Sequence, residues 1–117
     1  MDLHRLGRDV ERVSDSCAGL LGIVRDDAWY LLKLQEEVGE LTQAYLMRAG
    51  QARTRGMTPE EIDAGFRAEL ADVLCHVLLM ARHHGMDLAA EVERKWLARL
   101  PGEPEVPRGG ASGSGVT

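Results

Sequence analysis

Apolar residues recur along this chain every three or four positions, a spacing that places them on one face of an α-helix. The first such stripe contains Leu3, Leu6, Val10, Val13, Cys17 and Leu20. Leu and Ala together number 29, whereas Val, Ile and Thr number only 15, so the composition also favours helices over strands. The sequence therefore predicts an all-α fold whose first helix ends near Gly22.

Two capping segments predict where the next helices begin. Asp26 and Asp27 can cap a second helix over about residues 28–49. The segment Thr58–Glu61 combines a capping threonine, a proline at the first helical position and a glutamate three residues on, so a third helix should extend from there to about residue 84. Because this third helix carries the strongest apolar stripe, we expect it to be central to a bundle: Phe66, Leu70, Val73, Val77 and Met80.

Gly65 leaves two possibilities for the third helix, since a helical glycine costs about 1 kcal/mol relative to alanine. The helix is either continuous or broken there into two. Asp87 can cap a fourth helix over about residues 88–100. We therefore expect one domain over residues 1–100, with four helices, or five if the chain breaks near Gly65. A chain this small covers so apolar a helix poorly, which predicts that oligomerisation completes the bundle.

Composition and charge exclude several classes of protein. Residues 101–117 hold five of the 13 glycines and three of the four prolines, and this composition predicts a disordered tail.

Acidic residues outnumber basic ones by 19 to 14, which argues against nucleic-acid and membrane partners. Without a membrane-spanning segment or an apolar signal region at the N-terminus, we expect a cytoplasmic protein. Cys17 and Cys75 are expected to be buried free thiols.

Carboxylates flank the apolar stripes of the second and third helices, where an unpaired charge is expensive to bury. Glu37 and Glu40 are three residues apart on the second helix, and Glu69 and Asp72 repeat that spacing on the third. Lys33 can pair with only some of these acids. Two such helices packed together supply four oxygen ligands, which suits Mg²⁺. The alternative is a set of solvated acids, which are common on helix surfaces.

The two acidic motifs, with their surrounding residues, resemble a known family. Glu36-Glu37-x-x-Glu40 and Glu69-x-x-Asp72 lie within the segments LKLQEEVGELTQAYL and ELADVLCHVLLMARHHGMDL, at residues 32–46 and 69–88. Both are similar to the all-α nucleoside triphosphate pyrophosphohydrolases of the MazG type, and the resemblance covers about residues 29–99.

The resemblance implies an activity and a metal. Members of the family hydrolyse a nucleoside triphosphate between the α- and β-phosphates, giving a nucleoside monophosphate and pyrophosphate. They use Mg²⁺, for which Mn²⁺ can substitute, and they form homodimers or homotetramers. Carried over by motif position, the metal ligands here are Glu37, Glu40, Glu69 and Asp72.

Three further residues receive candidate roles, Glu36 as the acid of the triplet left over from coordination, and Lys95 and Arg99 through the same resemblance. Glu36 orients or deprotonates the attacking water, holds a further metal, or only pairs with Lys33. Lys95 looks like a lysine that many relatives place near the phosphates, although a lysine at a helix C-terminus is also favoured by the helix dipole. Arg99 is a second candidate phosphate ligand and stands where many relatives carry an asparagine.

His76 and Trp29 have one functional and one purely structural interpretation each. His76, one turn beyond Asp72, either lies close to the metal or a phosphate or is a hydrogen-bonded core histidine. Trp29, two turns before the acidic triplet, either stacks on a nucleotide base or packs on the core.

Two other functions remain open. Phosphoribosyl-ATP pyrophosphohydrolase of histidine biosynthesis is similar in the segment from Glu69 to His76 and cuts the same kind of bond. A non-catalytic helical interaction module would need no metal. A di-iron carboxylate bundle is disfavoured, because neither Glu37 nor Glu69 has a histidine three residues later. A role in clearing non-canonical or surplus nucleotides rests on the resemblance alone.

Overall fold

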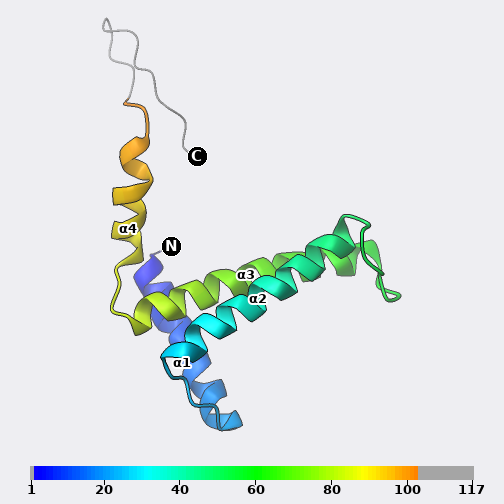
Figure 1. Ribbon diagram of the computed structural model, residues 1–117, viewed down its shortest axis with the longest axis horizontal. Coiled ribbons are helices and arrows are strands. Elements are labelled where there is room, and N and C mark those ends of the chain that lie inside the picture. The colour runs from blue at the N-terminus through cyan, green and yellow to red at the C-terminus, as the bar shows by residue number, and fades with distance from the viewer. Residues whose placement is uncertain (1, 103–117) are drawn as a thin grey trace, which may run out of the picture. The chain divides into compact units, whose positions relative to one another are not determined.

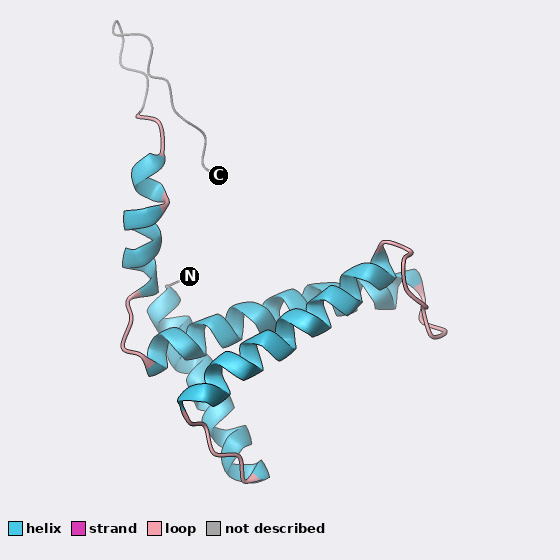
Figure 2. Cartoon of the chain, viewed as in Figure 1, coloured by secondary structure: helices cyan, strands magenta, loops and turns pink. Residues whose placement is uncertain are grey.

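Four α-helices and one short 3-10 helix form the part of the chain that is described, residues 2–102 of a computed structural model. Figure 2 shows loops and turns between them, and no strand occurs within residues 2–102. The predicted all-α class and the order of four helices are confirmed. The predicted disordered tail lies, from residue 103 onward, outside the described residues. The elements are α1 (Leu3–Leu21), α2 (Asp27–Arg48), α3 (Pro59–His83), α4 (Leu88–Lys95) and the 3-10 helix η1 (Leu97–Arg99).

Local capping interactions determine where the helices begin and end. Asp26 caps α2 and Asp87 caps α4, each through a side-chain oxygen that accepts a backbone N–H bond from the first turn. Thr58 and Glu61 form the predicted capping box at the start of α3, with reciprocal bonds of 3.1 and 2.9 Å. Gly22 ends α1 in the left-handed region, at φ 66°, which glycine adopts without steric cost. These signals are local, and the sequence predicted each of them correctly.

Two expected boundaries are refined by the structure. α3 is continuous through Gly65, so the five-helix alternative is wrong. The fourth helix stops at Lys95 and passes into η1, instead of reaching about residue 100 as an α-helix. Leu100 is extended, with ψ 136°, because the residue before a proline is disfavoured in the α region.

The described residues form two compact units, one up to Met86 and one from Asp87 onward, and each is described by itself. In the first unit α2 and α3 lie side by side and run in opposite directions, as an antiparallel hairpin (Figure 1). α1 crosses this hairpin near the start of α2 and the end of α3 (Figure 1). The buried core of this unit is small and lies mostly on the hairpin: Ala18, Tyr30, Ile62, Leu78, Leu79 and Ala81.

α1 packs through a different face from the one that its apolar stripe predicts. Its buried residues are Gly7 and Ala18, which both lie outside that stripe. Cys17 is exposed, so the expectation of a buried thiol is wrong there. Large residues of the stripe also stay exposed, including Val13 at 64% and Leu20 at 84%.

A second set of large apolar side chains is exposed on the hairpin. Leu31, Val38 and Tyr45 are spaced by seven residues and therefore share one stripe of α2, and Leu70 and Leu74 share one stripe of α3. Their exposed fractions lie between 44% and 52%. We call these five residues the apolar edge.

Candidate metal centre

The α2–α3 hairpin brings the two predicted acidic motifs together. α2 carries the acidic triplet in its middle, and α3 carries its acidic pair in its own middle turns, so the antiparallel arrangement places them side by side. Carboxylate oxygens of Glu37, Glu69 and Asp72 all lie within 4.8 Å of one another. Oxygens of Glu36, Glu37 and Glu40 do the same. Glu37 belongs to both groups and is the centre of the cluster.

Two of these acids bury an oxygen that lacks a hydrogen-bond partner. The Glu37 side chain reaches the helix interface, and the residue is only 7% exposed. Within residues 2–102, neither Glu37 Oε2 nor Glu69 Oε2 has a hydrogen-bond partner. A buried polar atom without a partner costs roughly 1–3 kcal/mol, and more when it is charged. The remaining acids of the cluster are exposed at its rim: Glu36, Glu40 and Asp72.

Lys33 offsets only part of this charge, as the sequence predicted. Its Nζ lies 3.2 Å from Glu36 Oε1 and 3.8 Å from Glu37 Oε1. Both contacts use the Oε1 side of the cluster, so they leave the buried Oε2 atoms of Glu37 and Glu69 unsatisfied. The carboxylates of the cluster therefore lack sufficient positive charge nearby.

The pKa values of the two buried acids reflect this imbalance. Burial, together with the neighbouring carboxyl of Glu40 and the charge of Asp72, raises the pKa of Glu37 to about 7. The pKa of Glu69 is also raised, first by burial and then by the charges of Glu40 and Asp72. A bound cation would favour the ionised form of both groups.

His76 lies beside the cluster, on the α3 turn that follows Asp72. Its Nε2 is 3.8 Å from Glu37 Oε1, and its side chain is largely buried. Burial is the main cause that lowers the pKa of His76, and Lys33 adds to the effect. The neutral ring is therefore favoured, and the structure places it next to the central carboxylate.

Trp29 lies at the same end of the cluster as His76, with their ring centroids 6.1 Å apart. Its ring meets the buried Tyr30 edge to face at 5.0 Å. Trp29 itself is half-buried, so it packs on the core and also keeps an accessible face.

Lys95 and Arg99 belong to the second unit. Lys95 ends α4 and Arg99 ends η1, and both are exposed. The carboxylate cluster belongs to the first unit, and each unit is described by itself. Their roles as phosphate ligands stay predictions.

Sequence reasoning missed Arg25, the residue immediately before the α2 cap. Its guanidinium carbon lies 6.0 Å from the centroid of the Trp29 ring. In the sequence, Arg25 is only a single arginine between two helices. Nothing in that pattern shows which side chains lie near it once α1 packs across the hairpin. His83, the last residue of α3, stacks on Tyr30 with the ring centroids 4.1 Å apart, and its Nε2 lies 2.6 Å from Asp27 Oδ1.

Comparisons of the chain with protein families, with curated proteins and with solved structures gave no match. Within the described residues, no helix is both long enough and apolar enough to cross a membrane. The carboxylate cluster and the resemblance of its motifs are therefore the features that bear on function.

Proposed function

We propose that this protein is a Mg²⁺-dependent nucleoside triphosphate pyrophosphohydrolase, which cleaves between the α- and β-phosphates. The observation that carries the proposal is the pair of buried, unpartnered carboxylate oxygens, Glu37 Oε2 and Glu69 Oε2, inside a five-acid cluster. A hydrated divalent cation would satisfy both oxygens and offset their charge. The similarity of both acidic motifs to the MazG-type family supplies the reaction.

The ligands fit Mg²⁺ by their chemistry. Glu37, Glu40, Glu69 and Asp72 offer only oxygen atoms, the ligand type that Mg²⁺ and Mn²⁺ accept, and two of them remain exposed to substrate. Bound Mg²⁺ supplies charge neutralisation for a triphosphate that the bare acids would repel.

The side chains around the cluster have distinct roles in this proposal. Glu36 is exposed and near the central carboxylate, so it can accept a proton from an attacking water or orient it. Lys33 holds Glu36 through its 3.2 Å contact. His76 contacts Glu37 as a neutral ring, and Trp29 presents a partly exposed face for a nucleotide base. Lys95 and Arg99 are proposed to contact the phosphates.

A pyrophosphate-release screen tests the activity. Purified protein would be incubated with canonical, deoxy and damaged nucleoside triphosphates and with phosphoribosyl-ATP, with Mg²⁺, with Mn²⁺ and with chelator. We expect a nucleoside monophosphate and pyrophosphate from at least one triphosphate, and only with metal present. Turnover of phosphoribosyl-ATP alone would assign the rival enzyme, and no turnover or metal binding would support the interaction module.

Matched variants separate chemistry from folding. Asp72→Asn and Glu69→Gln preserve side-chain shape, and each should reduce pyrophosphate release by more than about 100-fold while helix content is kept. Glu93→Gln, an exposed acid on α4, should retain full activity. Glu36→Gln tests the water-activating role, and full turnover in this variant would remove Glu36 from the mechanism.

A further inference from the structure

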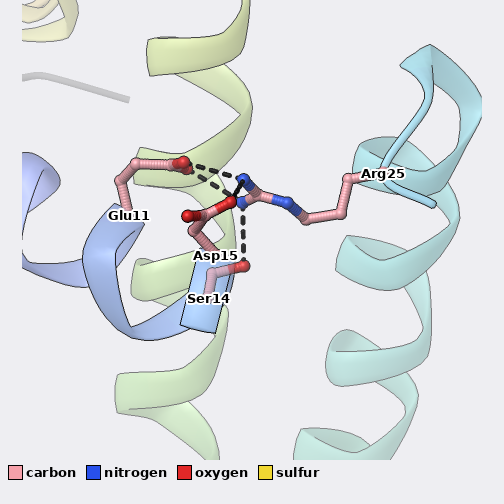
Figure 3. A network of polar contacts seen from close by, with 4 residues as sticks. All are labelled: Glu11, Ser14, Asp15 and Arg25. Atoms are coloured by element: carbon pink, nitrogen blue, oxygen red, sulfur yellow. Dashed lines mark hydrogen bonds and ion pairs between the residues drawn. The ribbon is translucent and has the colours of Figure 1, made fainter. Parts of the chain in front are cut away.

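Arg25 joins α1 to the start of α2 through a dense set of polar contacts (Figure 3). Its two terminal nitrogens donate to both carboxylate oxygens of Glu11, at 2.9 and 2.8 Å. Ser14 Oγ accepts a further bond at 3.0 Å, and Asp15 Oδ1 lies 3.3 Å away. The Arg25 side chain is only 12% exposed, so the guanidinium plane is held from several directions.

The same guanidinium contacts the aromatic pair at the start of α2. Its carbon lies 6.0 Å from the Trp29 ring centroid and 5.7 Å from that of Tyr30, within the range of a cation–π interaction. Arg25 is therefore anchored by α1 on one side and contacts two rings of α2 on the other.

A continuous chain of contacts leads from Arg25 to the carboxylate cluster. Trp29 lies against Tyr30 at 5.0 Å and against His76 at 6.1 Å. His76 Nε2 in turn lies 3.8 Å from Glu37 Oε1. Three neighbours, Arg25, Tyr30 and His76, thus constrain the orientation of the Trp29 ring. The ring lies at the end of the cluster where His76 contacts Glu37.

We propose that Arg25 is a positioning residue, which holds the Trp29 ring against His76 so that its free face receives the base of the nucleotide. The role in substrate binding rests on the proposed function, whereas the ring contact itself does not. The planar fork of arginine is needed, because lysine can pair with Glu11 as a point charge but cannot make two parallel bonds and also stack. The hydrogen bond from Arg25 lowers the pKa of Glu11 and keeps this carboxylate ionised, so the ion pair that anchors Arg25 is maintained.

The test uses Trp96→Phe as the background, so that Trp29 is the single tryptophan. In it, Arg25→Met and Arg25→Lys are compared with Arg8→Met, which replaces an exposed arginine of α1. We expect both Arg25 variants to show a red-shifted Trp29 emission and greater quenching by acrylamide, with helix content and Mn²⁺ affinity unchanged. Arg8→Met should leave the emission as it is.

Kinetics supply the second measurement. Both Arg25 variants should raise KM about two- to fivefold, a factor that corresponds to the loss of one weak cation–π contact, with kcat nearly unchanged. Unaltered Trp29 emission and quenching in folded Arg25→Met would overturn the proposal, as would equal losses in kcat. If Arg25→Met loses helix content, the same readouts on Arg25→Lys decide. If the parent protein releases no pyrophosphate, the proposed function fails, and the emission data still decide whether Arg25 holds Trp29.

Discussion

Glu37 is the residue on which the candidate site depends, because it belongs to both carboxylate groups and is the most buried acid among them. Its burial is costly in the metal-free protein, where the neighbouring Glu40 and Asp72 add repulsion. A carboxylate in this position lowers stability unless a cation compensates for it. Function and stability therefore make opposite demands on the same side chain.

Glu37→Gln tests this opposition, since the amide keeps the shape and removes the charge. With chelator at pH 8, we expect the free energy of unfolding to rise by on the order of 1–3 kcal/mol. Added Mg²⁺ should stabilise the natural protein and leave the variant unchanged. Urea unfolding followed by circular dichroism measures both effects. Glu93→Gln should change stability by less than about 0.5 kcal/mol, and a similar gain there would contradict the explanation.

The pH dependence of stability follows from the same residue. The pKa of Glu37 is raised from its ordinary value of 4.5 to about 7 by burial and neighbouring acids. Between these values the unfolded chain has released the proton while the folded chain still holds it, so stability falls as pH rises. Metal-free protein should therefore lose stability from pH 5 to pH 8 by a larger amount than Glu37→Gln does. Equal slopes in the two proteins, measured by urea unfolding, would refute the assignment.

Metal affinity should change with pH in the opposite direction. Because the carboxylate must be ionised to bind a cation, affinity for Mn²⁺ should weaken as pH falls below about 7.

The sequence predicted that these acids flank apolar stripes, but it did not rank their burial. That ranking depends on how α2 rotates against α3, which is a property of the packed pair. Only the structure shows that Glu37 is the central, buried carboxylate of the cluster, whereas Glu36 and Glu40 lie at the rim.

At the scale of the helices, local signals were sufficient wherever a boundary depends on neighbouring residues. Asp26, Thr58 and Asp87 cap the helices that the sequence assigned to them, since each bond is made within one turn. Contacts between helices were not predictable in this way. The exposed Cys17 and the clamp between Arg25 and Glu11 both result from how α1 crosses the hairpin.

Gly65 provides a test at this scale, because α3 continues through it in the helical conformation. A Cβ atom built at this position meets no atom within 4 Å. Gly65→Ala should therefore stabilise the protein by about 0.5–1 kcal/mol, by reducing the backbone freedom of the unfolded chain. Gly85→Ala is the contrasting variant, since Gly85 has φ 65° and alanine is strained there. Thermal unfolding should shift upward for Gly65→Ala and downward for Gly85→Ala, and a destabilised Gly65→Ala would reveal a packing role for that glycine.

At the scale of the whole molecule, the α2–α3 hairpin has two chemically different edges. Leu31, Val38 and Tyr45 lie about half a turn around α2 from Glu36 and Glu40. On α3, the stripe of Leu70 and Leu74 is similarly displaced from Asp72, so the apolar edge faces away from the carboxylates. A second copy of the chain could cover this edge without blocking the acids, which agrees with the oligomerisation that the sequence predicts.

Charge placed on the apolar edge tests whether a second copy covers it. Val38→Glu and Leu74→Glu replace half-exposed residues, so we expect the helical fold to survive while self-association weakens by at least about tenfold, because a buried unpaired charge is costly at an interface. Leu32→Glu is the matched control, since Leu32 is 62% exposed and lies outside this edge. Light scattering coupled to size exclusion, over a dilution series, measures the mass. An unchanged mass for Val38→Glu and Leu74→Glu, or an equal loss with Leu32→Glu, would place the interface elsewhere on the molecule.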